Sequence, residues 1–253
     1  MKKRFTLVLT SLIVCLCAMA TPPVVSASNL SFTSNLLDGG RFGFTFRKGD
    51  GAYRLIVVKE GSPITTEPVN GVSYPAGSTV FGTPGTEFNG DDGFVIFCGS
   101  HAVSNPSTIV TNLKYGTTYY MSIWEFNGSG TATEFLLIPL TGQITTKSAP
   151  TQQATISSFS NVTGNRMQVS WTGGNGEKTL LLARKGAPVN ATPEQLHDYT
   201  ANAAFGDGSA INGDNYVVYE GSGSSVTVTN LEPNTEYYFA IFEFNGNTGP
   251  VYL

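Results

Sequence analysis

Short runs of alternating apolar and polar residues recur along the chain between glycine-rich turns. Residues 167–171 (MQVSW) alternate as expected for a strand with one buried face, and residues 179–184 (TLLLAR) are almost continuously apolar. Residues 193–199, where Thr192 could cap one turn, are a weak helical candidate that we interpret as a loop turn. The pattern predicts an all-β protein. Further strands of the second half are expected at 154–159, 216–219, 225–229 and 236–244.

This pattern occurs twice. The segment TNLKYGTTYYMSIWEFNG, which begins at Thr111, recurs without a gap as TNLEPNTEYYFAIFEFNG from Thr229. Upstream of it, FGFTF (42–46) corresponds to MQVSW, and LIVV (55–58) corresponds to LLLA (180–183). Such a repeat indicates one structural unit used twice. We expect domain 1 at residues 28–146, a polar, proline-containing linker at 147–153 and domain 2 at 154–253.

The first 27 residues have the composition of an export signal. Lys2, Lys3 and Arg4 precede an apolar run over residues 5–20, and Val25-Ser26-Ala27 is a small-residue cleavage site. The run is short for a membrane helix, and no second such run follows in the sequence. We expect cleavage after Ala27 and a secreted or cell-surface protein, with no membrane span after signal removal.

Removal of the signal alters the charge and the cysteine content. Three of the 14 basic residues lie in it, so the net charge of −4 becomes about −7. This acidic balance, without a run of Lys or Arg, argues against a nucleic-acid partner. Cys15 and Cys17 leave with the signal, and Cys98 then stands alone, so no intrachain disulfide is expected.

A Trp on the second strand, followed much later by Leu-x-Pro-x-Thr-x-Tyr, resembles the fibronectin type III sandwich. Trp171 and the run LEPNTEY, which begins at Leu231 and ends at Tyr237, occupy those positions. Copy one departs from the pattern, with Phe46 in place of the Trp and Tyr115 in place of the Pro. The resemblance implies two tandem immunoglobulin-like β-sandwiches in which Tyr119 and Tyr237 bond the backbone of the preceding corner. The expected structural core is Trp171, Phe46, Leu113, Tyr119, Leu231 and Tyr237.

A narrower resemblance covers nearly the whole mature chain. The stretches GNGEKTLLLARKGAPVNATP, YTANAAFGDGS, NYVVYEGSG and EYYFAIFEFNG look like the fibronectin-type repeats of large secreted or surface proteins of Bacteroidetes bacteria. This resemblance implies a module of multidomain exported proteins, often beside an enzyme or a C-terminal sorting domain. The implied partners are other domains of the same polypeptide, with surface proteins or glycans as further candidates.

Few residues offer catalytic chemistry. His101 and His197 occupy loop positions that the repeat does not share, and no metal-ligand spacing surrounds them, so we interpret both as surface loop residues. Glu125 and Glu243 share one repeat position, so each would serve its own domain alone rather than form a catalytic pair. We interpret both as structural acids that bond the adjacent Asn-Gly turn. No catalytic, cofactor-binding or metal residue is assigned, and the protein is not expected to be an enzyme.

Two weaker candidates remain. Calcium could be held at Asp91 and Asp92, or at Asp207, Asn212 and Asp214, although neither group has the ligand pattern of an EF-hand. Adjacent strand residues face opposite ways, so Tyr120 and Tyr238 should point outward and could form a recognition surface. The alternative is that each ring packs on its cross-strand neighbour.

The second copy stops at Leu253, at the point where the first copy continues into its last strand. Domain 2 is therefore expected to lack that strand. The chain could be a fragment of a longer protein, which we favour, or end with a short strand, or take a strand from a partner. The preferred function is a non-catalytic spacer, adhesion or protein-interaction module. The alternative is a carbohydrate-binding or hydrolase accessory module whose loops 63–92 and 188–214 form a binding face.

Overall fold

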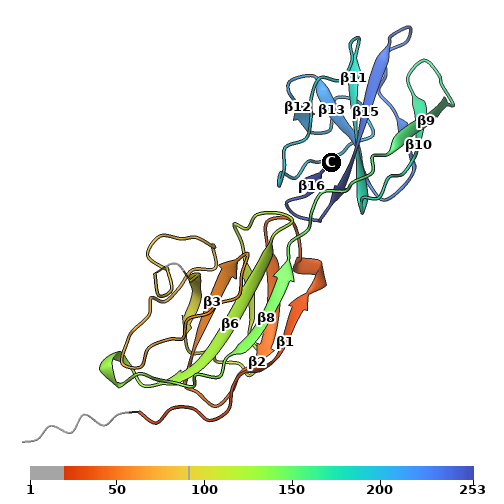
Figure 1. Ribbon diagram of the computed structural model, residues 1–253. Coiled ribbons are helices and arrows are strands. Elements are labelled where there is room, and N and C mark those ends of the chain that lie inside the picture. Colours follow the sequence, from red (N-terminus) through yellow and green to blue (C-terminus); the bar gives the residue numbers. More distant parts are fainter. Residues whose placement is uncertain (1–19, 91) are drawn as a thin grey trace, which may run out of the picture.

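Figure 1 shows a computed structural model of the chain, which describes residues 20–90 and 92–253. Two β-rich units follow one another along the chain, as the repeat predicts. Most of the expected signal peptide, residues 1–19, lies outside the described residues. Among the residues that are described, no helix is long and apolar enough to cross a membrane.

Domain 1 is a sandwich of two antiparallel sheets. Strands β1, β2 and β5 form the smaller sheet. In the larger sheet β3 lies between β4 and β6, and β6 also pairs with β7 and β8. The bounds are β1 (Ser28–Thr33), β2 (Phe42–Arg47), β3 (Tyr53–Glu60), β4 (Phe94–Gly99), β5 (Ser107–Val110), β6 (Thr118–Asn127), β7 (Glu134–Phe135) and β8 (Leu140–Thr145), with short 3-10 turns η1 (Ser34–Leu36) and η2 (Gly130–Ala132).

Domain 2 has the same arrangement of strands, except that β12 is added at one edge and no strand corresponds to β8 within the described residues. Strands β14, β10 and β9 form one sheet, and the other runs β12-β13-β11-β15-β16. Residues 193–199 contain only a turn, as expected. The structure confirms two tandem β-sandwiches. The bounds are β9 (Thr155–Ser160), β10 (Met167–Thr172), β11 (Lys178–Lys185), β12 (Ala210–Ile211), β13 (Asn215–Gly221), β14 (Ser225–Val228), β15 (Tyr237–Asn245) and β16 (Val251–Tyr252).

The domains differ at the strand that corresponds to β8. Within the described residues β15 pairs with β11 and β16, and no counterpart of β8 lies beside it. The effect on the core is direct. Tyr119, Met121 and Ile123 of β6, which pairs with β8, are at most 2% exposed, whereas Tyr237, Phe239 and Ile241 of β15 are only partly buried. The missing strand therefore leaves one edge of the domain 2 core open to solvent.

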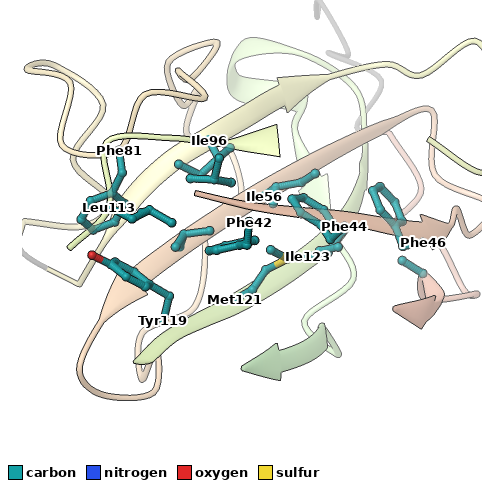
Figure 2. Close-up of a cluster of buried hydrophobic side chains, with 13 residues drawn as sticks. Phe42, Phe44, Phe46, Ile56, Phe81, Ile96, Leu113, Tyr119, Met121 and Ile123 are labelled. Carbon is teal, nitrogen blue, oxygen red and sulfur yellow. The ribbon is translucent and has the colours of Figure 1, made fainter. Parts of the chain in front are cut away.

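The inner core follows from the period of two in β2. Phe42, Phe44 and Phe46 project from one face of the strand, because alternate strand residues point the same way, and each is 1% exposed. Figure 2 shows them facing Ile56 of β3 and Met121 and Ile123 of β6. In domain 2, Trp171 takes the place of Phe46 and packs at 4.9 Å from Tyr219. Different side chains thus fill equivalent volumes.

Each large sheet carries a second core on its outer face. Loop residues 61–93 in domain 1 and 186–214 in domain 2, here called the covering loops, bring apolar side chains such as Phe88 and Val189 onto that face. Strands β3 and β11 are consequently buried on both sides, which explains their unbroken apolar runs. The left-handed Asn112 and Asn230 secure the loops, and their side-chain amides donate to the carbonyls of Phe81 (2.9 Å) and Phe205 (2.8 Å).

Contacts of the folded domains extend across the expected boundary and linker residues. Ala27 is 5% exposed and belongs to the inner core, so the folded domain 1 starts before residue 28. The expected linker also shrinks. The backbone N–H of Lys147 donates to Asp38 of domain 1, and the N–H groups of Thr151 and Gln152 donate to Asn175 of domain 2. The connection is therefore short, because most of residues 147–153 is hydrogen-bonded into one domain or the other.

Direct contacts cross the junction between the domains. Asp38, fully buried, pairs with Arg41 and accepts a hydrogen bond from the backbone N–H of Asn247 in domain 2 at 2.7 Å. Lys147 forms an ion pair with Glu177. Gly39 packs so closely against Val251 and Leu196 that an added Cβ would lie 2.3 Å from Val251. These contacts restrain the short connection.

Candidate binding site

The two repeated glutamates are buried structural acceptors. Glu125, 1% exposed, accepts the backbone N–H of Gly49 at 2.7 Å, and Glu243, 2% exposed, accepts those of Gly174 (2.9 Å) and Gly176 (2.8 Å). The turn they hold is therefore the Gly-Asx-Gly turn before β3 and β11, not the adjacent Asn-Gly turn that we expected. The reason is that the end of β6 or β15 lies across the sheet from this turn, which brings the carboxylate to its backbone.

The environments of these two acids differ. Arg54 of β3 is 2% exposed and pairs with Glu125 through Nε to Oε1 (3.1 Å) and Nη2 to Oε2 (3.0 Å). The equivalent residue of β11 is Thr179, whose hydroxyl donates to Glu243 at 3.2 Å. A buried ion pair in domain 1 is thus replaced by neutral donors in domain 2. In both domains the acid is committed to holding a turn, which leaves it no substrate-facing position.

The histidines and the cysteine do not converge. His101 is half-buried against Phe97 (4.1 Å) and Phe46 (5.7 Å), so it is not the surface loop residue that we expected. Burial and the nearby charges of Arg54 and Lys48 lower the pKa of its imidazole. His197 is exposed in a covering loop, and burial raises the pKa of the Cys98 thiol to about 11. Among residues 20–90 and 92–253, no group of three or more His, Cys, Asp or Glu side chains is placed to hold a metal.

Two of the acids proposed for calcium, Asp92 and Asp214, have basic partners. Asp92 is nearly buried, pairs with Lys59, and accepts the N–H groups of Thr65 (2.9 Å) and Thr66 (2.7 Å). Burial disfavours its charged form, but the hydrogen bonds from Lys59, Thr66 and Thr65 prevail and hold the pKa of its carboxyl well below the usual range. Asp214, at the equivalent place, pairs with Arg184 at 3.2 Å. Asp91 lies outside the described residues, and calcium binding stays a prediction.

The paired tyrosines divide between the two faces. The Tyr119 hydroxyl accepts the backbone N–H of Lys114 at 2.9 Å, and the Tyr237 hydroxyl accepts that of Glu232 at 3.0 Å. Both form the corner contact that the resemblance implies. Tyr238 is 36% exposed, and its hydroxyl donates to Glu236 at 3.0 Å. Tyr120 is half-buried, opposite Lys59 and Gln143 of the flanking strands, so the two outward rings offer different surfaces.

A cavity of about 240 Å³ opens on the outer side of domain 1, at the ends of β3, β4, β6 and β7. Four aromatic rings line it, from Tyr53, Tyr74, Phe126 and Phe135; we call it the aromatic hollow. Tyr53 stacks on Phe126 with ring centroids 5.3 Å apart, and Phe126 lies 4.9 Å from Phe135. The polar groups at the hollow are small: Ser73, Ser129, Thr133 and the Cys98 thiol. It therefore offers ring faces and few charges.

Sequence reasoning missed the aromatic hollow because its rings lie far apart in the chain. The one available signal was register: Tyr53 pairs with Phe126 across β3 and β6, and Phe126 pairs with Phe135 across β6 and β7. Such cross-strand aromatic pairs stabilise a sheet and can form a flat apolar platform. Recognising them requires the strand alignment, which local alternation does not provide.

Domain 2 keeps three of the four rings, as Tyr199, Phe244 and Tyr252, and has a charged residue in place of the fourth. Lys178 stands where Tyr53 stands and lies 5.9 Å from the Phe244 ring centroid, and it also pairs with Glu220, the counterpart of Cys98, at 3.7 Å. The stacked pair of Tyr53 and Phe126 is thus specific to domain 1, since Lys178 faces Phe244 in domain 2.

Comparison with known proteins gives structural likeness alone. No protein-family model and no curated protein sequence matches the chain. Similar solved structures include a segment of two fibronectin type-III domains from chicken tenascin, with 16% identity over 90% of this chain and 97% of that one and a TM-score of 0.29. The FN1–FN3 domains of chicken CNTN1 have 17% identity over 92% and 67% of the chains, with a TM-score of 0.33. The central fibronectin-III array of RIM-binding protein has 9% identity over 92% and 68%, with a TM-score of 0.29. The tandem-sandwich assignment rests on the strand order and cores described above.

Proposed function

We propose that this chain is a non-catalytic extracellular module of an exported, multidomain protein of the Bacteroidetes type, acting as a spacer, in adhesion or in protein interaction. The observation that supports this proposal is the commitment of Glu125 and Glu243 to backbone turns. A general acid or base must reach a substrate proton, and these carboxylates are buried and already bonded. Asp92, with Lys59, Thr65 and Thr66 around it, is committed in the same way.

A spacer must keep its length, and two features favour that role. Each domain has an inner and an outer core, and in the outer core the covering loop packs against the large sheet. At the junction the backbone of Asn247 is bonded to the buried Asp38, and Lys147 pairs with Glu177. These contacts oppose independent tumbling of the two domains.

The test is a search for turnover by the purified chain. Chromogenic glycosides, esters and peptides should show no hydrolysis above buffer. Reproducible turnover that disappears in a single folded variant, such as Asp207→Asn or Glu194→Gln, would overturn the proposal. Circular dichroism of each variant separates loss of an active acid from loss of the fold.

The aromatic hollow favours carbohydrate binding as the second candidate function. Sugar rings present apolar C–H faces that pack on aromatic rings, and Tyr53 is 37% exposed at the rim while stacked on Phe126. The cavity, about 240 Å³, is smaller than the 300–1,000 Å³ typical of drug-sized ligand sites, so a single ring would fit. Its small hydroxyl side chains would orient sugar hydroxyls.

The second candidate is tested by a substitution that copies domain 2. Glycans retained on an array would be titrated calorimetrically against the parent chain, Tyr53→Lys and the control Lys178→Ala. Tyr53→Lys should weaken binding at least tenfold, because it removes one ring of the platform, and Lys178→Ala should leave binding unchanged. Equal loss in both variants, or in neither, would contradict a sugar site at the hollow. Point substitution is preferable to truncating loops 63–92 or 188–214, because these loops carry core side chains.

A further inference from the structure

The segment before β1 repeats the segment that leads into β9. Pro23 and Pro150 are both buried, and Ala27 and Ala154 are 5% and 4% exposed within their respective inner cores. Residues 21–27 therefore correspond one for one with residues 148–154, and we call each a lead-in segment. In domain 2 this segment follows domain 1, so removal of an N-terminal signal leaves it in the chain. Domain 2 thus serves as the reference for what the unit contains.

The Asx side chain of the Gly-Asx-Gly turn holds the lead-in segment in each domain. Asp50 Oδ1 accepts the N–H groups of Val24 (3.1 Å) and Val25 (2.9 Å), and its own N–H donates to the Val25 carbonyl. In domain 2, Asn175 Oδ1 accepts the N–H groups of Thr151 and Gln152, both at 2.9 Å, and its N–H donates to the Gln152 carbonyl. Position, partner and direction agree between the copies.

Two further contacts extend the match. Asn127 Nδ2 donates to the Thr21 carbonyl at 2.8 Å, and Asn245 Nδ2 donates to the Ser148 carbonyl at 2.9 Å. A Cβ added at Gly49 would lie 2.0 Å from the Val25 carbonyl oxygen, and one added at Gly174 would lie 2.0 Å from that of Gln152. Glycine is required at both positions because the lead-in backbone occupies that space. The repeat unit therefore begins at Thr21, not at Ser28.

Cleavage after Ala27 would remove this whole segment from domain 1. Asp50 would lose its backbone donors, the Thr21 contact of Asn127 would disappear, and the core position of Ala27 would be vacated. A second small-x-small site lies upstream, because Ala18-Met19-Ala20 ends the apolar run just before Thr21. We infer that signal peptidase cleaves after Ala20, so that the mature protein begins at Thr21. Water adds across the Ala20–Thr21 peptide bond, leaving the carboxylate on Ala20 and the free amine on Thr21.

This inference rests on the proposed export of the chain, and it is tested by the N-terminus of the exported protein. The full chain, with a C-terminal tag, would be expressed in a bacterium with a general secretory pathway and purified from the exported fraction. Intact mass and N-terminal sequencing should give a chain that starts at Thr21. A start at Ser28 would overturn the inference while leaving export intact. An unprocessed chain inside the cell would overturn export itself.

Matched variants separate the two sites. Ala18 is the third residue on the N-terminal side of the proposed Ala20–Thr21 cut. Ala18→Lys places a charge there and should reduce processing at least tenfold. Val25→Lys places a charge at the same position relative to a cut after Ala27, and should not change processing if the cut follows Ala20. It should not disturb the fold either, because Val25 is 54% exposed and its backbone bonds remain. Normal processing of Ala18→Lys together with a block in Val25→Lys would contradict the inference. A mature chain made to begin at Ser28 should also melt at least about 5 °C below one beginning at Thr21.

Discussion

Domains 1 and 2 share their backbone-holding contacts and differ in the charges placed around them. In both, a buried glutamate of β6 or β15 holds the Gly-Asx-Gly turn, and the Asx holds the lead-in segment. Around this shared frame, Arg54 becomes Thr179, and the stacked Tyr53 becomes Lys178. The comparison indicates that residues whose side chains hold the backbone vary less between the copies than the residues that surround them. Three pairs of equivalent substitutions test this view.

The largest expected difference is at the buried glutamates. Glu125→Gln leaves the Arg54 guanidinium buried without its counter-charge and should destabilise domain 1 by about 3–5 kcal/mol. Glu243→Gln loses hydrogen bonds to Gly174 or Gly176 but strands no charge, and should cost about 1–3 kcal/mol. Urea unfolding followed by tryptophan fluorescence measures both, because the chain has 2 Trp residues, Trp124 in domain 1 and Trp171 in domain 2.

The control for this pair is the double variant Glu125→Gln with Arg54→Thr, which imitates the composition of domain 2. It should recover part of the stability lost by Glu125→Gln alone, since the unpaired charge is gone. Equal effects of Glu125→Gln and Glu243→Gln would show that Arg54 does not cause the difference.

The next difference concerns the ion pairs Lys59–Asp92 and Arg184–Asp214, which occupy equivalent places. The Asp92 side chain is 6% exposed and that of Asp214 is 60% exposed. Asp92→Asn should cost about 1–3 kcal/mol, because the carboxylate holds Lys59, Thr65 and Thr66. Asp214→Asn should change the free energy of unfolding by less than about 1 kcal/mol. Urea denaturation of both variants, monitored as above, provides the comparison.

The same aspartate predicts a pH dependence. The folded-state pKa of Asp92 is depressed below the ordinary value of about 3.9, so its stabilising contribution is present above that pH and is lost as pH falls further. Domain 1 should therefore lose stability below about pH 4, and Asp92→Asn should lose less over that range. Urea unfolding of the parent and the variant at a series of acidic pH values measures this. An equal loss of unfolding free energy in both proteins would contradict this role for Asp92.

The smallest difference is expected at the corner tyrosines. Tyr119→Phe leaves the Lys114 N–H without its acceptor beside a ring that is 1% exposed, and should cost about 1–2 kcal/mol. Tyr237→Phe should cost about 0.5–1 kcal/mol, because the partly open corner of domain 2 lets water replace the hydroxyl. Thermal unfolding of the two variants ranks them. A larger effect at Tyr237 would contradict the idea that the open β15 edge weakens this corner.

Alternation and repetition predicted most of the strands. Residues 167–171 lie within β10, residues 179–184 within β11 and residues 225–229 overlap β14. One-sided burial imposes a period of two on β10 and β14, whatever they pair with, whereas β11 is buried on both faces and was predicted from its continuous apolar run. The contacts of residues 21–27 and 148–154 could not be predicted in this way, because these lead-in segments have no alternation. They are held by single side chains, Asp50 and Asn175, from a distant turn.

The candidate site was less accessible to sequence reasoning. The outward Tyr120 and Tyr238 were predicted from alternation alone, whereas the aromatic hollow depends on Tyr53, Phe126 and Phe135 meeting across three strands. Loops 63–92 and 188–214 were considered only as a binding face, yet Phe88 and Val189 pack on the large sheets as part of a second core. Isolated apolar residues in a turn-rich loop have no period from which their burial could be read.

By itself the sequence determined that one β-sandwich unit is used twice, which strands build it and that the repeated glutamates act separately. Those properties depend on neighbouring residues and on matching copies, both of which can be read along the chain. Only the tertiary structure decided which turn Glu125 and Glu243 hold, where the folded unit begins and which faces the loops cover. Each of these is a contact between segments far apart in sequence, and strand pairing in three dimensions selects it.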